Sequence, residues 1–481
     1  MSQEALDPKL AAAAGQAVSR RSRSLVPLIV GSALMLQQME ASIITNALPT
    51  MAKALGEDPL RLNMAITVYL LASAVFLPLS GWVGDRFGAK RVYLASMVLF
   101  AVSSAGCGLS QNLEQLVVGR MIQGAAAAMM APVARLVLLR STPKSELVSA
   151  LSIYTMPAVF APLAGPALGG FIVTYFDWRW IFFINLPLAA ISILLATYVP
   201  DIPKEKHVPK IDWTGLALTG VALASLVFAL ENVGRAFLPG WQVAALFALG
   251  VVCSLLYWRH ARGNPNAAVD ISLFKIPTYA AATIGGAFQR LLISATPYLL
   301  AILLQIGFGM TAFAAGLMVM ASGLASLFMK FVAPPLIERF GFRNLMIFNG
   351  VAFGLSIMMY ALFRPGMAVW LMVVILAVGG LFRSLQFTVL SGLGFADVSS
   401  AQMSRASTLT SMAVQLVQTI GVTFATILLH ANARLRGDGA LTWQAVGPVF
   451  VVMGLVTMLS LFWYVRMPKD AGASLSGRSS A

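Results

Sequence analysis

Six ionisable side chains stand inside long apolar stretches of this sequence: Glu40, Arg120, Arg135, Arg290, Lys330 and Arg383. Glu40 is the one acid among them, so it is the side chain best suited to take up and release a proton. Burial favours its neutral form, whereas a nearby guanidinium favours the carboxylate. We expect Arg120, with Gln123 one helical turn further on, to sense the charge of Glu40. A permanent ion pair with only a structural role is the alternative.

The stretches that carry these residues indicate a lipid bilayer. Of 481 residues, 59% are hydrophobic and 11% charged, with a mean hydropathy of +0.82, whereas a soluble domain carries about 25% charged residues. A span needs roughly 20 apolar residues. Segmentation at that length predicts fourteen, at 25–49, 62–83, 92–110, 116–139, 147–174, 181–199, 213–233, 241–259, 280–306, 312–333, 345–363, 368–390, 408–430 and 445–466. A charge deep in a span costs on the order of 3 kcal/mol, which makes each one a functional candidate. Arg135 and Lys330 lie near span ends, and we expect both to extend to the membrane surface.

A short charged hairpin between the second and third spans has the most specific spacing in the chain. Its pattern is formed by Gly81, Asp85, Arg86, Gly88, Lys90 and Arg91. A weaker copy, Glu-Arg-Phe-Gly-Phe-Arg, begins with Glu338 and Arg339 in the second half. Gly81 would let two helices approach closely, and Asp85 could face the N-terminus of a neighbouring helix. A repeated hairpin predicts a repeated half.

This hairpin resembles the signature loop of the major facilitator superfamily of transporters, although the family usually has Arg in place of Ala89. The resemblance implies an all-α polytopic membrane protein with two six-helix bundles, and a hairpin that governs the conformational switch. Two inserted helices bring the number of transmembrane helices to fourteen. The predicted parts are a tail at 1–24, a first bundle at 25–199, linkers with the two extra helices at 200–279, a second bundle at 280–466 and a tail at 467–481.

Further motifs resemble the fourteen-span drug:proton antiporter subfamily, and the resemblance runs from Leu25 to about Met467. Glu40 precedes Ala-Ser-Ile-Ile-Thr-Asn-Ala-Leu-Pro, where the subfamily usually has Asp in place of Glu40. Arg120, Gln123 and Gly124 match its Arg-x-x-Gln-Gly pattern. The fifth span ends in the motif typical of antiporters, formed by Gly165, Pro166, Gly169 and Gly170. The sixth begins with a Trp-Arg-Trp segment that runs on to Asn185-Leu-Pro. The resemblance implies proton coupling through Glu40, Arg120 and Gln123.

A second group of polar and aromatic residues is expected to contact substrate. These residues are Gln37, Tyr154, Phe160, Gln289, Arg290, Arg383, Gln386, Phe387 and Gln415. Three intramembrane arginines against one central acid favour an anionic, zwitterionic or neutral amphiphile over a dication. For any single Gln, an interhelical hydrogen bond is the alternative, and Arg290 could bind backbone carbonyls instead of substrate.

Other functional classes find little support in the sequence. The net charge of +15 reflects Lys and Arg concentrated in loops on one side of the predicted membrane, so it indicates cytoplasmic termini rather than nucleic-acid binding. The three histidines, His207, His260 and His430, form no sequence cluster with Cys or acids, so we expect solvated surface residues and no metal site. No Gly-x-x-x-x-Gly-Lys-Ser/Thr loop is present, which argues against direct powering by ATP. Cys107 and Cys253 both lie in spans, where no disulfide is expected.

The sequence therefore predicts a transporter rather than an enzyme: a proton-coupled antiporter that exports small amphipathic compounds by alternating access. We expect a monomer in the inner membrane of a bacterial cell, with no cofactor other than the proton gradient. Its expected partners are the bilayer, protons and the substrate. The alternatives are an exporter of one endogenous anionic or lipid-like metabolite and a membrane-embedded transferase.

Overall fold

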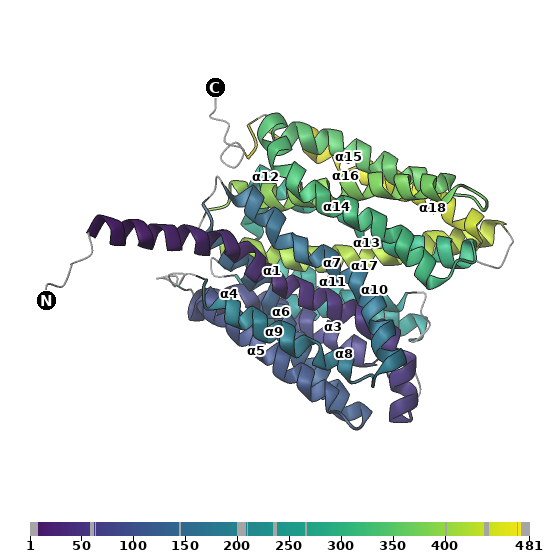
Figure 1. Ribbon diagram of the computed structural model, residues 1–481, viewed down its shortest axis with the longest axis horizontal. Helices are drawn as coiled ribbons and strands as arrows, with labels where there is room; N and C mark the ends of the chain where they lie inside the picture. Colours follow the sequence, from purple (N-terminus) through teal and green to yellow (C-terminus); the bar gives the residue numbers. More distant parts are fainter. Residues whose placement is uncertain are drawn as a thin grey trace, which may run out of the picture.

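The computed structural model describes residues 8–57, 62, 64–143, 146–199, 208, 210–233, 238–264, 267–399, 402–436, 442–468 and 470–472. Within these ranges every regular element is a helix (Figure 1). The first half contains α1 (Pro8–Leu55), α3 (Met64–Phe76), η1 (Leu77–Leu79), α4 (Ser80–Phe87), α5 (Ala89–Gly108), α6 (Leu113–Ser141), α7 (Leu147–Tyr175), α8 (Trp180–Phe183) and α9 (Asn185–Ala196).

Two further helices follow, α10 (Trp213–Asn232) and α11 (Gly240–Gly263). The second half contains η3 (Ile271–Lys275), α12 (Pro277–Ala280), the π-helical η4 (Ala281–Gly285), α13 (Gly286–Ala301), the π-helical η5 (Ile302–Gly307), α14 (Ala312–Phe340), α15 (Phe342–Met358), η6 (Met359–Leu362), α16 (Val369–Ala396), α17 (Met403–Arg436), α18 (Trp443–Met458) and α19 (Leu461–Val465).

The predicted spans coincide with these helices. By length and composition, 11 described helices could cross a membrane. Three shorter apolar helices, Leu25–Glu40, Leu147–Ala161 and Trp180–Ala196, fall on the first, fifth and sixth predicted spans. The all-helical membrane fold is therefore confirmed. One boundary differs: α1 begins at Pro8, well before the predicted start of the first span at residue 25.

The helices of each half pack mainly against one another. In the first half α1 packs on α7, and α3 and α5 both pack on α6. In the second half α14 and α15 pack on α16, and α13 packs on α17. Figure 1 shows the two groups as a purple-to-blue layer and a green-to-yellow layer. This arrangement places α1 and α6, which carry Glu40 and Arg120, in one bundle.

The extra pair is attached to both halves through α10. A Cβ atom on Gly220 of α10 would lie 3.0 Å from the carbonyl oxygen of Val75 in α3. On the other side, Thr423 of α17 donates a hydrogen bond to the carbonyl oxygen of Leu230, with 2.9 Å between the atoms. The helix α10 therefore contacts an element of each bundle, while α11 packs along α10.

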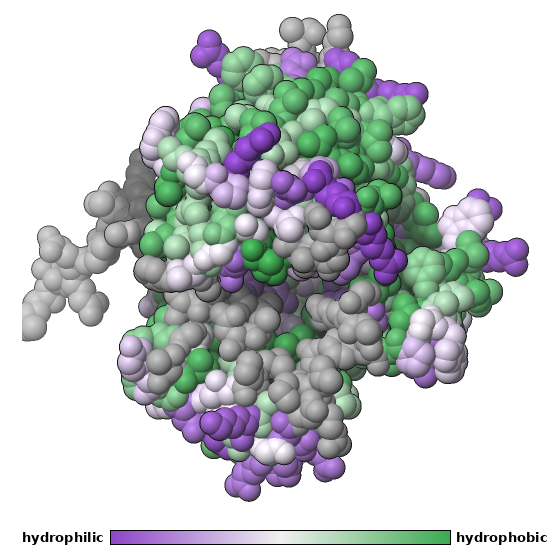
Figure 2. Space-filling model, turned by 90° about the vertical axis from the view of Figure 1, so that its right-hand side faces the viewer, coloured by the Kyte–Doolittle hydropathy of each residue, from purple (hydrophilic) through white to green (hydrophobic). Residues whose placement is uncertain are grey.

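The surface supports a bilayer setting. Large apolar side chains on the helix sides are exposed, among them Val102, Leu194, Phe328 and Phe348. Figure 2 views the end of the molecule that is opposite α4, where hydrophilic side chains gather while apolar side chains flank them. The surface is hollowed between the two lobes in this view. An apolar belt with a polar end is the distribution that a membrane-embedded helical protein requires.

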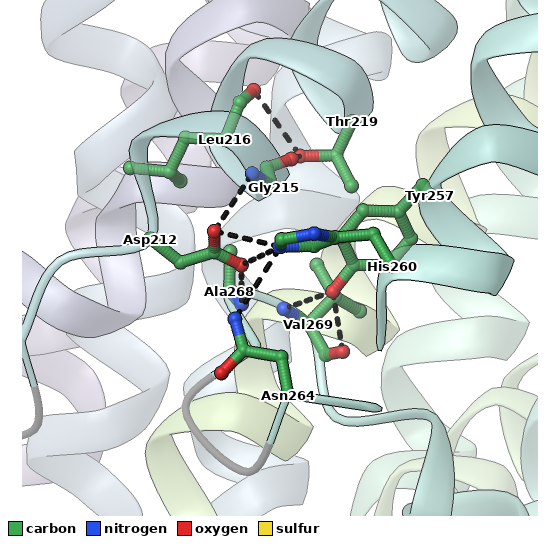
Figure 3. A network of polar contacts seen from close by, with 9 residues as sticks. All are labelled: Asp212, Gly215, Leu216, Thr219, Tyr257, His260, Asn264, Ala268 and Val269. Atoms are coloured by element: carbon green, nitrogen blue, oxygen red, sulfur yellow. Dashed lines mark hydrogen bonds and ion pairs between the residues drawn. The ribbon is translucent and has the colours of Figure 1, made fainter. Parts of the chain in front are cut away.

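A polar network joins the start of α10 to the end of α11 and to the segment that follows α11 (Figure 3). Asp212 accepts a hydrogen bond from the Gly215 N–H (2.9 Å) at the start of α10, and its carboxylate lies 2.9 Å from Nε2 of His260 on α11. It also accepts from the Ala268 N–H at 3.1 Å. Burial raises the pKa of Asp212, but these hydrogen bonds outweigh it and hold the pKa below its ordinary value.

This network corrects the expectation that every histidine is a solvated surface residue. His260 pairs with an acid: Asp212 directly precedes α10, and the C-terminal end of the antiparallel α11, which carries His260, lies beside the start of α10. His430 is exposed, as expected, and His207 lies outside the described residues. Among the described residues no three of His, Cys, Asp and Glu are placed to hold a metal ion.

Candidate functional site

Glu40 and Arg120 form a buried ion pair between α1 and α6. The relative exposed fraction is 3% for Glu40 and 1% for Arg120. Nη1 of Arg120 also donates to Oε1 of Gln123 (2.7 Å), and its Nε donates to the Ala65 carbonyl (3.2 Å). The guanidinium lies over the ring of Tyr69, with 4.3 Å from Cζ to the ring centroid. The structure thus brings together the three residues that the sequence places in one coupling group.

A fourth member of this group, Asn185, was not among the predicted site residues. It begins α9 and is fully buried, and its Nδ2 donates to Oε2 of Glu40 and to Oγ of Ser104 (3.1 Å). Both carboxylate oxygens of Glu40 therefore have a donor. The signal was available, since an Asn in the apolar start of the sixth span needs a polar partner.

Small residues on α6 permit this close arrangement. A Cβ atom on Gly124 would lie 2.3 Å from the Tyr69 carbonyl oxygen of α3, and one on Gly119 would lie 2.7 Å from Sγ of Cys107. Gln37 of α1 donates to the carbonyl of Ala127 at 2.6 Å. Arg120 therefore projects from a helix face that neighbouring backbones approach directly, which holds the guanidinium in place.

The two halves meet at the end that carries the hairpins. Ser404 donates to the Gly81 carbonyl (2.9 Å), the hydroxyls of Ser80 and Thr408 lie 3.2 Å apart, and Ser407 donates to the Pro132 carbonyl (2.9 Å). These contacts join α4 and α6 to the first turns of α17. The expectation that Gly81 permits a close approach is confirmed, since a Cβ there would lie 2.6 Å from Oγ1 of Thr408.

Comparison with known proteins decides the family. The model of the Major Facilitator Superfamily matches residues 30–279 and 279–480 of this chain. The chain belongs to the major facilitator superfamily. It is therefore a transporter rather than an enzyme, and the repeated hairpins are explained by its two matching halves.

Several curated relatives match nearly the whole chain. Proteins named "Putative multidrug resistance protein MdtD" are 32% identical in Pectobacterium atrosepticum, over 92% of this chain and 95% of the relative, and 33% identical in Salmonella heidelberg, over 92% and 94%. Solved structures share the fold. The human organic anion transporter MFSD10 has a TM-score of 0.64 at 15% identity, covering 93% of this chain and 99% of that one. The proton:xylose symporter XylE has a TM-score of 0.64 at 14% identity, covering 94% and 98%.

The two superfamily hairpins share a backbone turn but not an ion pair. Gly88 and Gly341 both adopt positive φ, 96° and 76°, in the region that favours glycine. Asp85 accepts a hydrogen bond from Nη2 of Arg140 at 2.7 Å, an interaction the sequence did not predict. Among the described residues Glu338 forms no ion pair and is exposed. Arg86, Arg91 and Arg339 are exposed, and Lys90 donates to the Thr197 carbonyl (3.4 Å).

We expect Asp85→Asn to shift the protein away from the state in which the hairpin end is closed, because the pair with Arg140 of α6 holds α4, whose Gly81 contacts α17. The side chains of Asp85 and Arg140 are 15% and 13% exposed, so losing the pair should cost about 1 to 2 kcal/mol, or about a five- to thirtyfold change in population. Spin-label distances between the first turns of α5 and α15 would report it. Arg140→Gln should give the same change, and the double variant should add nothing further. Unchanged distances would contradict this role for the pair.

The antiporter motif lies where α7 packs on α1. A Cβ atom on Gly169 would lie 3.1 Å from the Ile43 carbonyl oxygen, so this glycine permits helix contact. Gly165 is buried in the same helix. Pro166 and Gly170 also belong to α7, and the burial of these two residues lies outside what the structure describes.

The residues expected to contact substrate fall into two groups. Four of them take part in hydrogen bonds within the protein: Tyr154 donates to the Ala131 carbonyl (3.2 Å), Gln289 to Ser460 (2.8 Å), and Arg290 to the Ala282 carbonyl of its own span (3.0 Å), while Gln386 accepts from Asn349 (2.6 Å). Arg383, Phe387 and Gln415 are half-buried, and Phe160 is 47% exposed.

Arg135 and Lys330 do not extend to the membrane surface, contrary to expectation. Nη1 of Arg135 donates to Oγ of Ser411 (3.1 Å) on α17. Lys330 is 3% exposed, and its Nζ donates to Thr155 (2.8 Å) and Thr388 (3.0 Å). Hydroxyl groups of the opposite half lie within reach of both side chains, so hydrogen bonding replaces solvation at the surface.

Proposed function

We propose that this protein is a proton-coupled antiporter that exports small amphipathic compounds from the cell. The relatives named for multidrug resistance support this class of substrate. The buried network of Glu40, Arg120, Gln123 and Asn185 supports proton coupling, and it is the observation that carries the proposal. An acid placed inside a membrane protein and held by donors is a natural proton carrier.

In the proposed mechanism, the chemical step is reversible protonation of Glu40. Protonation removes the negative charge that attracts Arg120, so the ion pair between α1 and α6 loses its Coulombic attraction. The guanidinium then keeps its bonds to Gln123 and the Ala65 carbonyl. Because α1 and α6 both pack on other helices of the first bundle, a changed contact between them can bias the orientation of that bundle.

The closed hairpin end suggests how a change in the orientation of the first bundle would open or close the two sides of the protein. We infer that both termini and both hairpins face the cytoplasm, as the excess of Lys and Arg in those loops indicates. The contacts of Gly81 and Pro132 with α17 then close the cytoplasmic side. In this proposal, a proton entering from outside reaches Glu40 in this state, and the switch to the inward-facing state releases it inside. The setting we propose is the inner membrane of a bacterium, with a monomer as the working unit.

Transport by the purified protein tests the proposal. In proteoliposomes with an acidic lumen, we expect uphill uptake of amphipathic dyes through molecules whose cytoplasmic side faces the bath. An uncoupler should collapse the accumulation to equilibrium, and adding substrate should release protons from the lumen. Accumulation that ignores the pH gradient would reject proton coupling. Transport of one metabolite, with no response to the dye panel, would favour the alternative of a dedicated exporter.

A further inference from the structure

Two basic residues of the second bundle, Lys330 on α14 and Arg383 on α16, lie on helices that pack together, and no described acid pairs with either. Nη2 of Arg383 donates to Oγ of Ser326 at 3.3 Å, and Ser326 precedes Lys330 by one helical turn on the same face of α14. Nζ of Lys330 in turn donates to Oγ1 of Thr388 on α16 at 3.0 Å, so both side chains lie at the interface of α14 and α16.

These two groups have more donors than the protein supplies acceptors. An ammonium has three N–H donors and a guanidinium five. The two hydroxyls of Thr155 and Thr388 serve Lys330, and one hydroxyl serves Arg383, within the part of the chain that is described. Among the described residues, most of the donors on Arg383 therefore have no acceptor, while the side chain keeps part of its surface accessible. A pair of like charges with unused donors is costly unless an anion joins it.

The surrounding packing fixes the positions of the two helices that carry Lys330 and Arg383. A Cβ atom on Gly380 of α16 would lie 2.2 Å from the Ser322 carbonyl oxygen of α14, so the two backbones touch directly. Ser384 donates to the Ser326 carbonyl at 2.6 Å and fixes the register of the two helices. The site is therefore built into the bundle rather than formed by flexible surface side chains.

An aromatic ring completes this group. Nζ of Lys330 lies 5.1 Å from the centroid of the Phe387 ring, and Phe387 follows Arg383 by one helical turn on α16. The ring is half-buried, so it has a surface on which an apolar body can pack. Two cations beside an aromatic ring are complementary to an amphiphile with an acidic group next to a ring system.

We propose that Lys330 and Arg383 bind the acidic group of an amphipathic substrate, a carboxylate or sulfonate, while Phe387 packs against its apolar part. This inference rests on the proposed transport function and specifies its substrate class. It adds a binding role for Lys330, which the sequence placed at the membrane surface.

The position of Thr155 makes the proposed anion affinity differ between the two conformational states. Thr155 belongs to α7 of the first half, whereas Lys330 and Thr388 belong to the second. When the halves separate at the hairpin end, Thr155 leaves and an ammonium donor becomes available to the anion. When that end closes, Nζ of Lys330 again donates to Oγ1 of Thr155 and this donor is lost to the anion. The anion is thus held more tightly in the state open to the hairpin end and released more readily in the state seen here, which is the order that export requires.

Binding of a matched pair of probes to the purified full-length protein tests the inference. The probes are radiolabelled naphthalene-2-sulfonate and uncharged naphthalene-2-sulfonamide, measured by scintillation proximity. We expect the wild type to prefer the sulfonate. Lys330→Gln and Arg383→Gln should each weaken sulfonate binding about tenfold or more, the loss of one charged hydrogen bond, with sulfonamide binding changed less than about twofold. Lys330→Arg keeps the charge and should retain most of the preference.

Arg135→Gln is the matched control, because Arg135 is another cation that reaches across the halves to a hydroxyl but lies outside this pair. It should leave the sulfonate preference unchanged. A wild type that prefers the sulfonamide, or equal losses for both probes in Lys330→Gln, would overturn the inference. Proton-driven transport without sulfonate preference rejects only this inference. Lys330-dependent sulfonate binding without proton-driven transport supports the inference and rejects the proposed coupling.

Discussion

Replacement of Glu40 by Gln will abolish uphill transport and leave downhill exchange of substrate measurable. The substitution keeps the volume of the side chain and its ability to accept a hydrogen bond from Asn185, but it removes the titratable proton. Without a protonation change, the attraction between residue 40 and Arg120 has only one value, so the pH gradient has no group to act on. In proteoliposomes with an acidic lumen, we expect the accumulation ratio to fall from its wild-type value to equilibrium.

Glu114→Gln provides the matched control for this experiment. Glu114 is an exposed carboxylate in the first turn of α6, the helix that also carries Arg120. The same chemical change there should leave accumulation unaffected. Glu40→Asp should retain part of the coupling, because it keeps the acid while shortening its reach to Arg120. Full uphill transport by Glu40→Gln would show that the buried ion pair is structural and that protons travel by another group.

Gly81→Leu will prevent closure of the hairpin end and reduce turnover by more than about tenfold. A Cβ atom at this position already lies 2.6 Å from Oγ1 of Thr408 and 3.0 Å from Oγ of Ser404, and a leucine adds three further carbons. Overpacking by even a methylene group costs about 1 to 3 kcal/mol, which corresponds to roughly a five- to hundredfold change in population. Spin-label distances across the hairpin end should lengthen, and transport should slow in parallel.

Gly106→Leu separates this effect from a general intolerance of larger residues. Gly106 is also a helical glycine of the first half, and nothing lies within 4 Å of a Cβ atom built on it. That variant should keep wild-type distances and turnover. If Gly81→Leu leaves the distances unchanged while Gly106→Leu behaves as expected, the contact between α4 and α17 does not control the switch.

Hydrophobicity made the architecture readable from the chain alone. Unbroken apolar stretches can satisfy their backbone groups in lipid only as helices, so the fourteen spans and the class of fold followed from segmentation. The local hairpin motif was equally informative about the internal repeat. The spacing around Gly88 recurs around Gly341 and predicted a duplicated half, and in the structure both glycines adopt positive φ.

Part of the candidate site could also be predicted. Glu40, Arg120 and Gln123 were expected to meet, and the last two are separated by one helical turn of α6. Asn185 was missed, since it comes from the sixth span and reaches Glu40 only through the packing of α9 near α1. Asp212 and His260 were missed for the same reason. A hydrogen bond between distant segments depends on the relative rotation and height of two helices, which a single sequence does not encode in any local pattern.

The sequence by itself determined that this is a helical membrane protein with two related halves, an acid inside the first span and a repeated charged hairpin, because these properties depend on composition and short-range spacing. Only the tertiary structure decided which of the buried charges are paired. Arg120 neutralises Glu40, whereas Lys330 and Arg383 share one region without a described acid. The physical reason is the short range of hydrogen bonds in a low-dielectric interior: a shift of a few ångströms between helices decides whether a buried charge meets a carboxylate, a hydroxyl or another cation.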